Sequence, residues 1–248
     1  DPTLPENQVD STGAGTWWLD VGPTNLYAMF DGMVSTQTSG PSPLTVVLKP
    51  GAFNGFALFG LDGDHIHITA RTNTGGSIYY EYDEDLESSA PPDYYEYFYD
   101  PFKPQTQLIA TGLLPYGSAE ITITVTKTTG NAKIGMLALG LFTAIGAPLR
   151  GATVEPVDYS YISTDQFGTT TVKKRYNATG MTISGQSSVE EASVVLDTVK
   201  QLLGTPCVVI GSTKANFQGM TVFGLVSGRM AYVQADEVTL NLTVKGLV

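Results

Sequence analysis

The chain is poor in the residues on which disulfide frameworks, metal centres and nucleic-acid surfaces depend. It has one cysteine, two histidines and 13 lysines and arginines among 248 residues. A single thiol, Cys207, cannot form a disulfide within the chain. Because it lies in the apolar run 207–210, we interpret it as a small buried hydrophobic side chain rather than a nucleophile. The 24 acidic residues leave a formal net charge of −11, which repels nucleic-acid phosphates, so no nucleic-acid partner is expected.

Long apolar runs and catalytic motifs are also missing. No stretch approaches the ~18–20 apolar residues that span a bilayer, so no membrane insertion is expected. The chain contains no GxSxG, HExxH, phosphate-binding loop or cysteine pair, and we expect neither enzyme activity nor a cofactor. The first residue is Asp1 rather than Met. We therefore expect the chain to begin part-way through a longer product.

Short strands separated by Gly, Pro, Asn and Asp predict a mainly β fold. We expect a jelly-roll-like antiparallel β-sandwich followed by a small α+β domain with one helix. The residues from 119 to 127 alternate between apolar and polar, which predicts a strand with one buried face. Residues 129–131 predict a hairpin turn. The predicted sandwich strands are 26–30, 44–48, 55–60, 65–71, 77–82, 107–111, 120–126 and 133–141.

The C-terminal part carries the only convincing helix. Ser188 and Glu191 fit a capping box, and apolar residues from Ala192 to Leu203 recur at helical spacing. Gly204 and Pro206 predict its end. The strands predicted around it are 159–164, 169–176, 207–211, 220–226, 231–234 and 238–244. The expected organisation is a linker or arm over 1–16, a β-sandwich over 17–145, a linker over 146–157 and an α+β domain over 158–248.

Residues 79–102 hold the densest unusual patch, in which tyrosines alternate with acidic residues. Tyrosine offers a flat apolar face and a hydroxyl group, which suit contacts with sugars or protein partners. The patch is interpreted either as a recognition loop for a glycan or a partner, or as a solvated acidic loop covering an edge of the sandwich. The recognition residues predicted within it are Tyr94, Tyr95, Tyr97 and Tyr99. Its paired carboxylates also suggest a glycosidase, which we disfavour because no apolar pocket is evident to raise a carboxyl pKa.

The two histidines, His65 and His67, are predicted to point to the same face of one strand. They are the only candidate metal ligands, with Asp62 and Asp64 beside them. Two imidazoles per chain make an incomplete site unless symmetry supplies more. We favour a polar strand face over a metal site.

Trp17 and Trp18 open the run WWLDVGPTNLYAMFDG at residues 17–32. They suggest either a platform for sugar stacking or an anchor that docks the preceding linker on the sandwich, and the anchor is favoured. Residues 1–18 resemble the end of small chitin- or cellulose-binding-like modules. The run from Trp17 resembles a junction in tailed-bacteriophage virion proteins, where such a module precedes a β-sandwich. Leu26 and Tyr27 depart from that family, in which Arg-Trp is expected.

Two further stretches carry the same resemblance. DYYEYFYDPF (93–102) is similar to the family's sandwich, and DYSYISTDQFGTTTVKKR (158–175) with the following helix resembles its C-terminal domain. The resemblance implies a structural protein of the virion at the tail tip or baseplate, with carbohydrate-binding capacity and a role in host attachment. Expected partners are other virion tail proteins, further copies in a homo-oligomer with a trimer favoured, and a host-surface glycan. Trp17 and Trp18 are carried over as ligand-binding remnants of the lost module. The alternative is a secreted lectin-like or accessory carbohydrate-binding protein.

Overall fold

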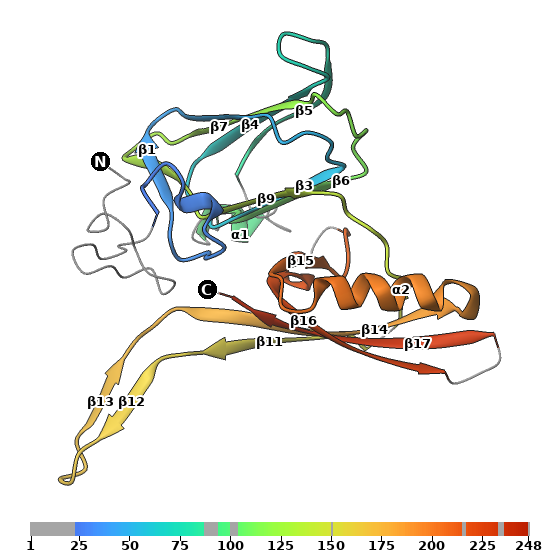
Figure 1. Cartoon of the computed structure of the whole chain (residues 1–248). Helices are drawn as coiled ribbons and strands as arrows, with labels where there is room; N and C mark the ends of the chain where they lie inside the picture. The colour runs from blue at the N-terminus through green and yellow to red at the C-terminus, as the bar shows by residue number, and fades with distance from the viewer. Residues whose placement is uncertain are drawn as a thin grey trace, which may run out of the picture.

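The structure is a computed structural model that describes residues 23–86, 94–99, 104–149, 151–214, 217–232 and 236–247. The described residues form two packed modules, a β-sandwich and a C-terminal sheet covered by one long helix (Figure 1). This arrangement confirms the predicted fold class, which is mainly β with an α+β part at the C-terminus. The predicted linker over 1–16 lies outside the described residues.

The sandwich has two antiparallel layers. The first layer has the strand order β2-β7-β4-β5, formed by β2 (Leu44–Leu48), β7 (Glu120–Thr126), β4 (His65–Arg71) and β5 (Ile78–Asp85). The second layer has the order β6-β3-β9, with the pair β1-β8 beside it. Its strands are β6 (Gln107–Thr111), β3 (Gly55–Phe59), β9 (Met136–Gly140), β1 (Thr38–Pro41) and β8 (Asn131–Ile134).

Strands β8 and β9 are two halves of one interrupted strand. The break falls at Gly135, whose N–H donates to the carbonyl oxygen of Phe59 at 3.0 Å. A Cβ atom at Gly135 would lie 2.9 Å from the carbonyl oxygens of Phe59 and Val34, so only glycine allows this close approach. The predicted continuous strand over 133–141 is therefore wrong at this residue. With the two halves joined, the layers run β1-β8/β9-β3-β6 and β2-β7-β4-β5, the order of a jelly roll.

Alternation along the strands places the sandwich core. In β7, Ile121, Ile123 and Val125 are fully buried, while the threonines between them face outward. Strand β3 differs because all five of its residues are buried. Phe56 and Leu58 point into the sandwich core, whereas Ala57 and Phe59 belong to a second apolar cluster outside it. A strand that is buried on both faces is expected to be uniformly apolar, as GFALF is.

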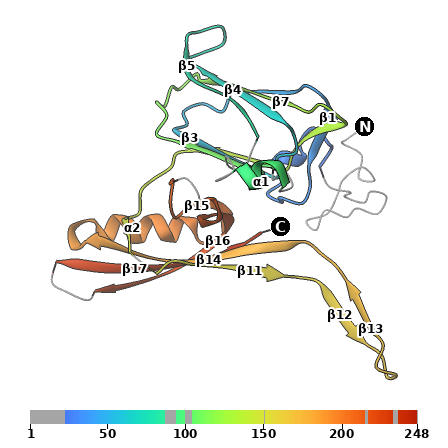
Figure 2. The ribbon, with the colours of Figure 1, turned by 180° about the vertical axis from the view of Figure 1, so that it is seen from behind.

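The C-terminal module is a curved antiparallel sheet with one long helix. The helix α2 (Val189–Leu202) begins after Ser188, whose side chain accepts a hydrogen bond from the Glu191 N–H, as the capping box predicts. Its apolar side packs on the sheet (Figure 2). The sheet order is β10-β14-β17-β16-β15, and β11 also pairs with β14. The strands are β10 (Ala147–Pro148), β11 (Thr153–Asp158), β14 (Asn177–Ser188), β15 (Cys207–Ile210), β16 (Thr221–Tyr232) and β17 (Glu237–Gly246).

The segment predicted as a linker, 146–157, contributes two strands to this sheet. Both β10 and β11 pair with β14. Pro156 lies within β11 opposite Thr179, and an edge strand tolerates proline because its outer N–H positions need no partner. The segment still connects the modules, but most of it belongs to the C-terminal one.

Two further local predictions are wrong. Residues 26–30 form a turn and the 3₁₀ helix η2 (Ala28–Phe30) rather than a strand, because Met29 is fully buried and its N–H donates to the Thr38 hydroxyl at 3.0 Å. The chain does turn at residues 129–131, where Gly130 has φ of 88°. The strands on either side are not a hairpin, because β7 pairs with β2 and β4 while β8 pairs with β1.

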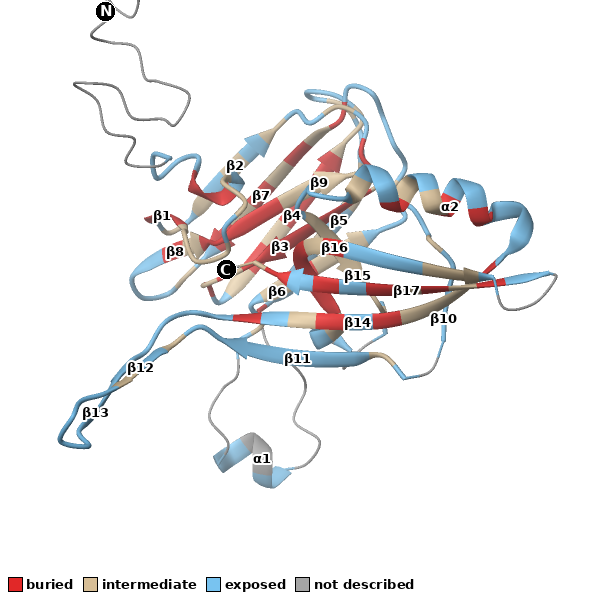
Figure 3. Cartoon of the chain, turned by 60° about the horizontal axis from the view of Figure 1, so that its bottom comes forward, coloured by how far each residue is buried: buried red, intermediate tan, exposed pale blue. Residues whose placement is uncertain are grey.

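A two-stranded hairpin extends from the C-terminal sheet. It comprises β12 (Tyr161–Thr164) and β13 (Thr170–Lys173), which pair only with each other. Figures 1 and 2 show it pointing away from both modules, at the far end of β11 and β14. We call residues 159–176 the projecting hairpin. Figure 3 shows that almost all of it is exposed, as is β11 beside its base.

The two modules are joined by an apolar contact. Phe59 of β3 and Phe223 of β16 lie with their ring centroids 6.4 Å apart, and Ala57 and Met136 complete the buried cluster. The neighbouring residue Val222 belongs instead to the core under α2. Strand β16 therefore buries one face against its own helix and the other against the sandwich.

Helices of a length and apolar character sufficient to cross a bilayer do not occur in the described part of the chain.

Candidate functional site

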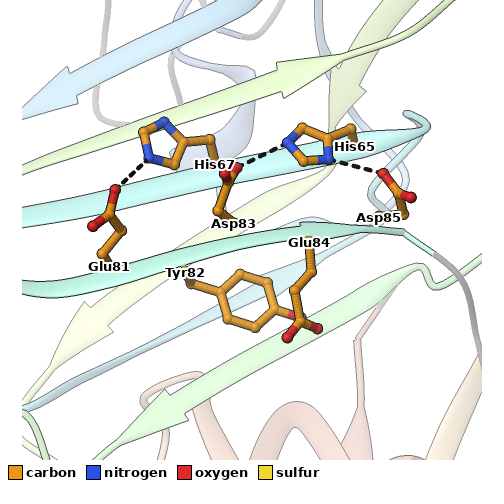
Figure 4. Close-up of polar contacts among 7 residues, drawn as sticks. All are labelled: His65, His67, Glu81, Tyr82, Asp83, Glu84 and Asp85. Carbon is orange, nitrogen blue, oxygen red and sulfur yellow. Dashed lines mark hydrogen bonds and ion pairs between the residues drawn. The ribbon is translucent and has the colours of Figure 1, made fainter.

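The outer face of β4 and β5 carries a row of alternating histidines and carboxylates. We call His65, His67, Glu81, Asp83 and Asp85 the His–acid row (Figure 4). His65 Nδ1 lies 2.9 Å from Asp85 Oδ1, and its Nε2 lies 2.9 Å from Asp83 Oδ1. His67 Nε2 lies 3.2 Å from Glu81 Oε1. The histidines thus share one strand face, as predicted, and the antiparallel register supplies acidic partners from β5.

Both ring nitrogens of His65 face a carboxylate. This arrangement affects the protonation state of the imidazole. A neutral imidazole donates one hydrogen bond, while an imidazolium donates two. The hydrogen bond with Asp85 is the largest cause of the raised pKa of His65; burial opposes it, and the contact with Asp83 adds to the increase. The two carboxylates therefore shift the equilibrium of His65 toward its positively charged form.

The titration of His65 tests this geometry. We expect its imidazole to titrate above the usual value of 6.5 when followed by NMR. Because the pKa is raised in the folded chain, the stabilising contribution is fully present below the unfolded-state pKa. It is lost as the pH rises through the folded-state pKa. The Asp85→Asn change removes the first contact and should shift the titration to lower pH.

The matched control for this prediction is Glu84→Gln. Glu84 is adjacent to Asp85, but its side chain faces the other side of β5 and accepts a hydrogen bond from the Tyr82 hydroxyl at 3.1 Å (Figure 4). Burial and this contact raise the pKa of Tyr82 to about 12. The control variant should leave the pKa of His65 unchanged. A wild-type His65 that titrates at or below its usual value would contradict the two-carboxylate bridge.

The row is not arranged as a metal centre. Within the described ranges, no group of three or more His, Cys, Asp or Glu side chains is placed to hold a metal ion. Asp62, a candidate neighbour of the histidines, contacts Lys127 and Lys133. The Asp64 carboxylate accepts a hydrogen bond from the Thr128 N–H. Hydrogen bonding to the Thr128 side chain, and then to its N–H, holds the pKa of Asp64 below the usual value. Both aspartates therefore bind the β7–β8 loop instead of joining the histidines.

The predicted recognition tyrosines lie on a short helix, α1 (Tyr94–Tyr99). Tyr94 is 86% exposed, and Tyr95 and Tyr99 are 69% and 73% exposed. The rings of Tyr95 and Tyr99 lie 4.9 Å apart with an interplanar angle of 33°, as expected for residues one helical turn apart. The helix therefore presents these three tyrosine rings to solvent. The side chain of Tyr97 lies outside the described residues, as do Trp17 and Trp18.

An apolar cleft of about 500 Å³ lies between β9, the segment that follows it, β15 and the end of α2. Phe142, Ile145 and Leu202 are among its lining residues, together with Cys207. Cys207 is half-buried, and burial raises the pKa of its thiol. A thiol with a raised pKa is a poor nucleophile, which agrees with the predicted hydrophobic role.

The projecting hairpin is the surface that sequence reasoning missed. The strands and the turn at residues 165–168 were predicted, but their exposure was not. Ile162, Phe167 and Val172 are 65%, 84% and 63% exposed. A strand with β-branched residues predicts burial of one face, whereas this two-stranded hairpin leaves both faces exposed.

A scan against protein-family models and searches of curated proteins and of solved structures found no match to this chain. Inferences about its function therefore rest on its residues and on the geometry described above.

Proposed function

We propose that the chain is a non-enzymatic structural component of a tailed-bacteriophage tail tip or baseplate. The observation that carries the proposal is the projecting hairpin, whose apolar side chains lie exposed although both ends of the hairpin are tied by hydrogen bonds. Exposed apolar surface on an element that projects from the fold is typical of a protein that binds neighbours in an assembly. Residues 17–32 and 158–175 resemble virion proteins of tailed bacteriophages, and this resemblance supports a phage tail as the assembly.

The sandwich agrees with this proposal. Jelly rolls recur in viral structural proteins and in lectins, although a fold alone does not determine function. The His–acid row pairs His65 with two carboxylates and His67 with one, and no Ser or Cys side chain hydrogen-bonds to either histidine among the described residues. We propose accordingly that the chain performs no catalysis. Turnover of a glycan that disappears after Glu→Gln or Asp→Asn changes within residues 81–100 would overturn this.

Localisation in the particle tests the main proposal. Antibodies against the purified chain should label intact phage particles at the distal end of the tail in negative-stain electron microscopy. Antibodies against a capsid protein provide the control for labelling elsewhere on the particle. Particles that remain unlabelled at the tail, and that lack the chain by mass spectrometry, would overturn the virion assignment.

A second function, glycan recognition, is favoured by α1. Its exposed rings, Tyr94, Tyr95 and Tyr99, offer the flat apolar faces on which sugar rings stack. In the virion proposal this surface contributes to host attachment. In the alternative, a secreted lectin-like protein, it is the principal binding site, and the purified chain would be a strict monomer with sugar affinity of about micromolar.

Glycan binding by α1 is tested with the double variant Tyr94→Ala/Tyr95→Ala on a glycan array. Loss of two stacking rings, at about 0.5–1.5 kcal/mol each, should weaken binding about fivefold to a hundredfold. The matched control is Tyr232→Ala, because Tyr232 is 64% exposed on β16, away from α1. Binding that is equal in the double variant and in the wild type would remove α1 from the recognition surface.

A further inference from the structure

Hydrogen bonds at both ends fix the shape of the projecting hairpin. At the tip, Asp165 Oδ1 accepts from the N–H groups of Phe167 and Thr169, both at 2.8 Å. Gly168 has φ of 83°, as such a turn requires. At the base, the Arg175 N–H donates to the Ser160 hydroxyl at 3.1 Å. The backbone of the hairpin is therefore tied at its tip and at its base, while the side chains between them are exposed.

The described part of the chain leaves the apolar side chains of the hairpin exposed. Ile162 and Val172 lie directly opposite each other, so their side chains share one face of the hairpin. Tyr161 lies on the other face and is 56% exposed, and the tip residue Phe167 is 84% exposed. A lone two-stranded hairpin is marginally stable in water. A partner that covers either face would bury apolar area and stabilise the hairpin.

The charge of the hairpin is opposite to that of the rest of the chain. Residues 159–176 contain one acidic residue, Asp165, and three consecutive basic residues, Lys173, Lys174 and Arg175. The other 230 residues contain 23 acidic and 10 basic residues. The hairpin thus has a formal charge of +2 and the remainder −13. All three basic residues are exposed. The hairpin is therefore attracted to an acidic surface, such as that of the remainder of this chain.

The hairpin points away from its own sandwich in Figures 1 and 2, so the acidic surface it contacts belongs to another molecule. Contact between two hairpins would bring two basic runs together, which is unfavourable. We propose that the projecting hairpin docks on the body of a second copy of this chain, where the body is every described residue outside 159–176. This inference rests on the proposed assembly function, and it identifies a second copy of the chain as the partner that the hairpin binds. Such a contact is heterologous, and it closes into a ring or continues as a filament.

Self-association of the purified full chain tests the proposal. Sedimentation velocity over a concentration series should show assembly in the wild type. The apolar variant Ile162→Thr/Phe167→Ser/Val172→Thr and the charge variant Lys173→Glu/Lys174→Glu/Arg175→Glu should each weaken it at least tenfold. Raising the salt from about 0.05 M to about 0.5 M should weaken it in the wild type, because screening shortens the range of the attraction.

A matched control separates local charge from net charge. The variant Lys214→Glu/Arg229→Glu/Lys245→Glu changes the net charge by the same amount at exposed positions outside the hairpin. It should assemble much more strongly than the hairpin charge variant. All variants replace exposed residues, so their thermal unfolding should match that of the wild type within a few degrees. Equal loss of assembly in the control and in the hairpin charge variant would overturn the proposal.

Mixing distinguishes docking on the body from pairing of hairpins. The tagged apolar variant should not associate with itself, but its body should still bind the hairpin of an untagged wild-type copy. Wild-type chain should therefore copurify with the tagged variant. A photocrosslinker placed at position 167 should link to the body of a second copy. Failure to copurify, or crosslinks confined to the same chain or to a second hairpin, would overturn the proposal.

The outcomes also separate this inference from the proposed function. A wild-type chain that stays monomeric at every concentration, although antibodies label the phage tail, would overturn the second-copy partner alone. A chain that assembles through its hairpin but is missing from phage particles would overturn the virion assignment alone.

Discussion

Replacing Phe56 by alanine is expected to lower the free energy of unfolding by about 3–5 kcal/mol. The ring is fully buried between the two layers of the sandwich, and it meets the ring of Tyr80 edge-on with centroids 5.9 Å apart. The change removes buried apolar area and leaves a cavity that the paired strands on either side of β3 cannot close. Since domains are stable by about 5–15 kcal/mol, a loss of this size removes a large part of the free energy of unfolding.

Urea unfolding followed by far-UV circular dichroism measures the Phe56→Ala effect. The conservative variant Phe56→Leu fills much of the cavity and should lose less. Val47→Thr serves as the surface control, because Val47 is 54% exposed on the outer face of β2. It should change stability by no more than about 0.5 kcal/mol. A Phe56→Ala loss as small as that of the control would show that the ring does not support the core.

Strands that bury one face and expose the other were predictable from the sequence. The predicted ranges 44–48, 65–71, 107–111 and 120–126 coincide with β2, β4, β6 and β7. In β4 and β7, apolar and polar side chains alternate and so separate the inside from the outside of the sandwich. The capped helix was predictable for a similar reason, since both its cap and its apolar stripe are local in sequence.

The missed strands are those held in place by pairing rather than by side-chain pattern. Strand β14 reads NATGMTISGQSS, which is rich in small polar residues, yet it has neighbours on both sides. Its extended form is stabilised by hydrogen bonds to β11 and β17, which lie far from it in sequence. Strand β11 contains proline and has no buried residue. The extended form of neither strand can be predicted from the residues within that strand alone.

The candidate surfaces show the same division. The shared face of His65 and His67 follows from strand geometry, and the structure confirms it. Their acidic partners depend on the register of β4 against β5, which the sequence does not specify. The exposure of Ile162, Phe167 and Val172 could not be predicted either, because it results from the direction in which the hairpin leaves the sheet. The sequence pattern identified candidate residues such as His65 and His67. The topology of the strands determines which residues contact them.

Replacing Phe223 by alanine is expected to uncouple the two modules. Phe223 is 7% exposed on β16 and packs against Phe59 of the sandwich with ring centroids 6.4 Å apart. Truncation of a buried phenylalanine costs about 3–5 kcal/mol, and here the loss falls on the contact that joins the modules. We therefore expect a single thermal transition in the wild type to separate into two, because modules that no longer stabilise each other unfold independently.

Differential scanning calorimetry measures this separation, and the matched control is Phe217→Ala. Phe217 lies in the same module but is 48% exposed, so its loss should leave the transition intact. A double-mutant cycle with Phe59→Ala should give a coupling of about 0.5–3 kcal/mol, as expected for residues in direct contact. One unchanged transition in Phe223→Ala, together with no coupling to Phe59, would mean that the modules are held together elsewhere. The projecting hairpin belongs to the C-terminal module. When the hairpin is docked on a neighbouring copy, the contact between Phe59 and Phe223 therefore fixes the orientation of the sandwich relative to that neighbour.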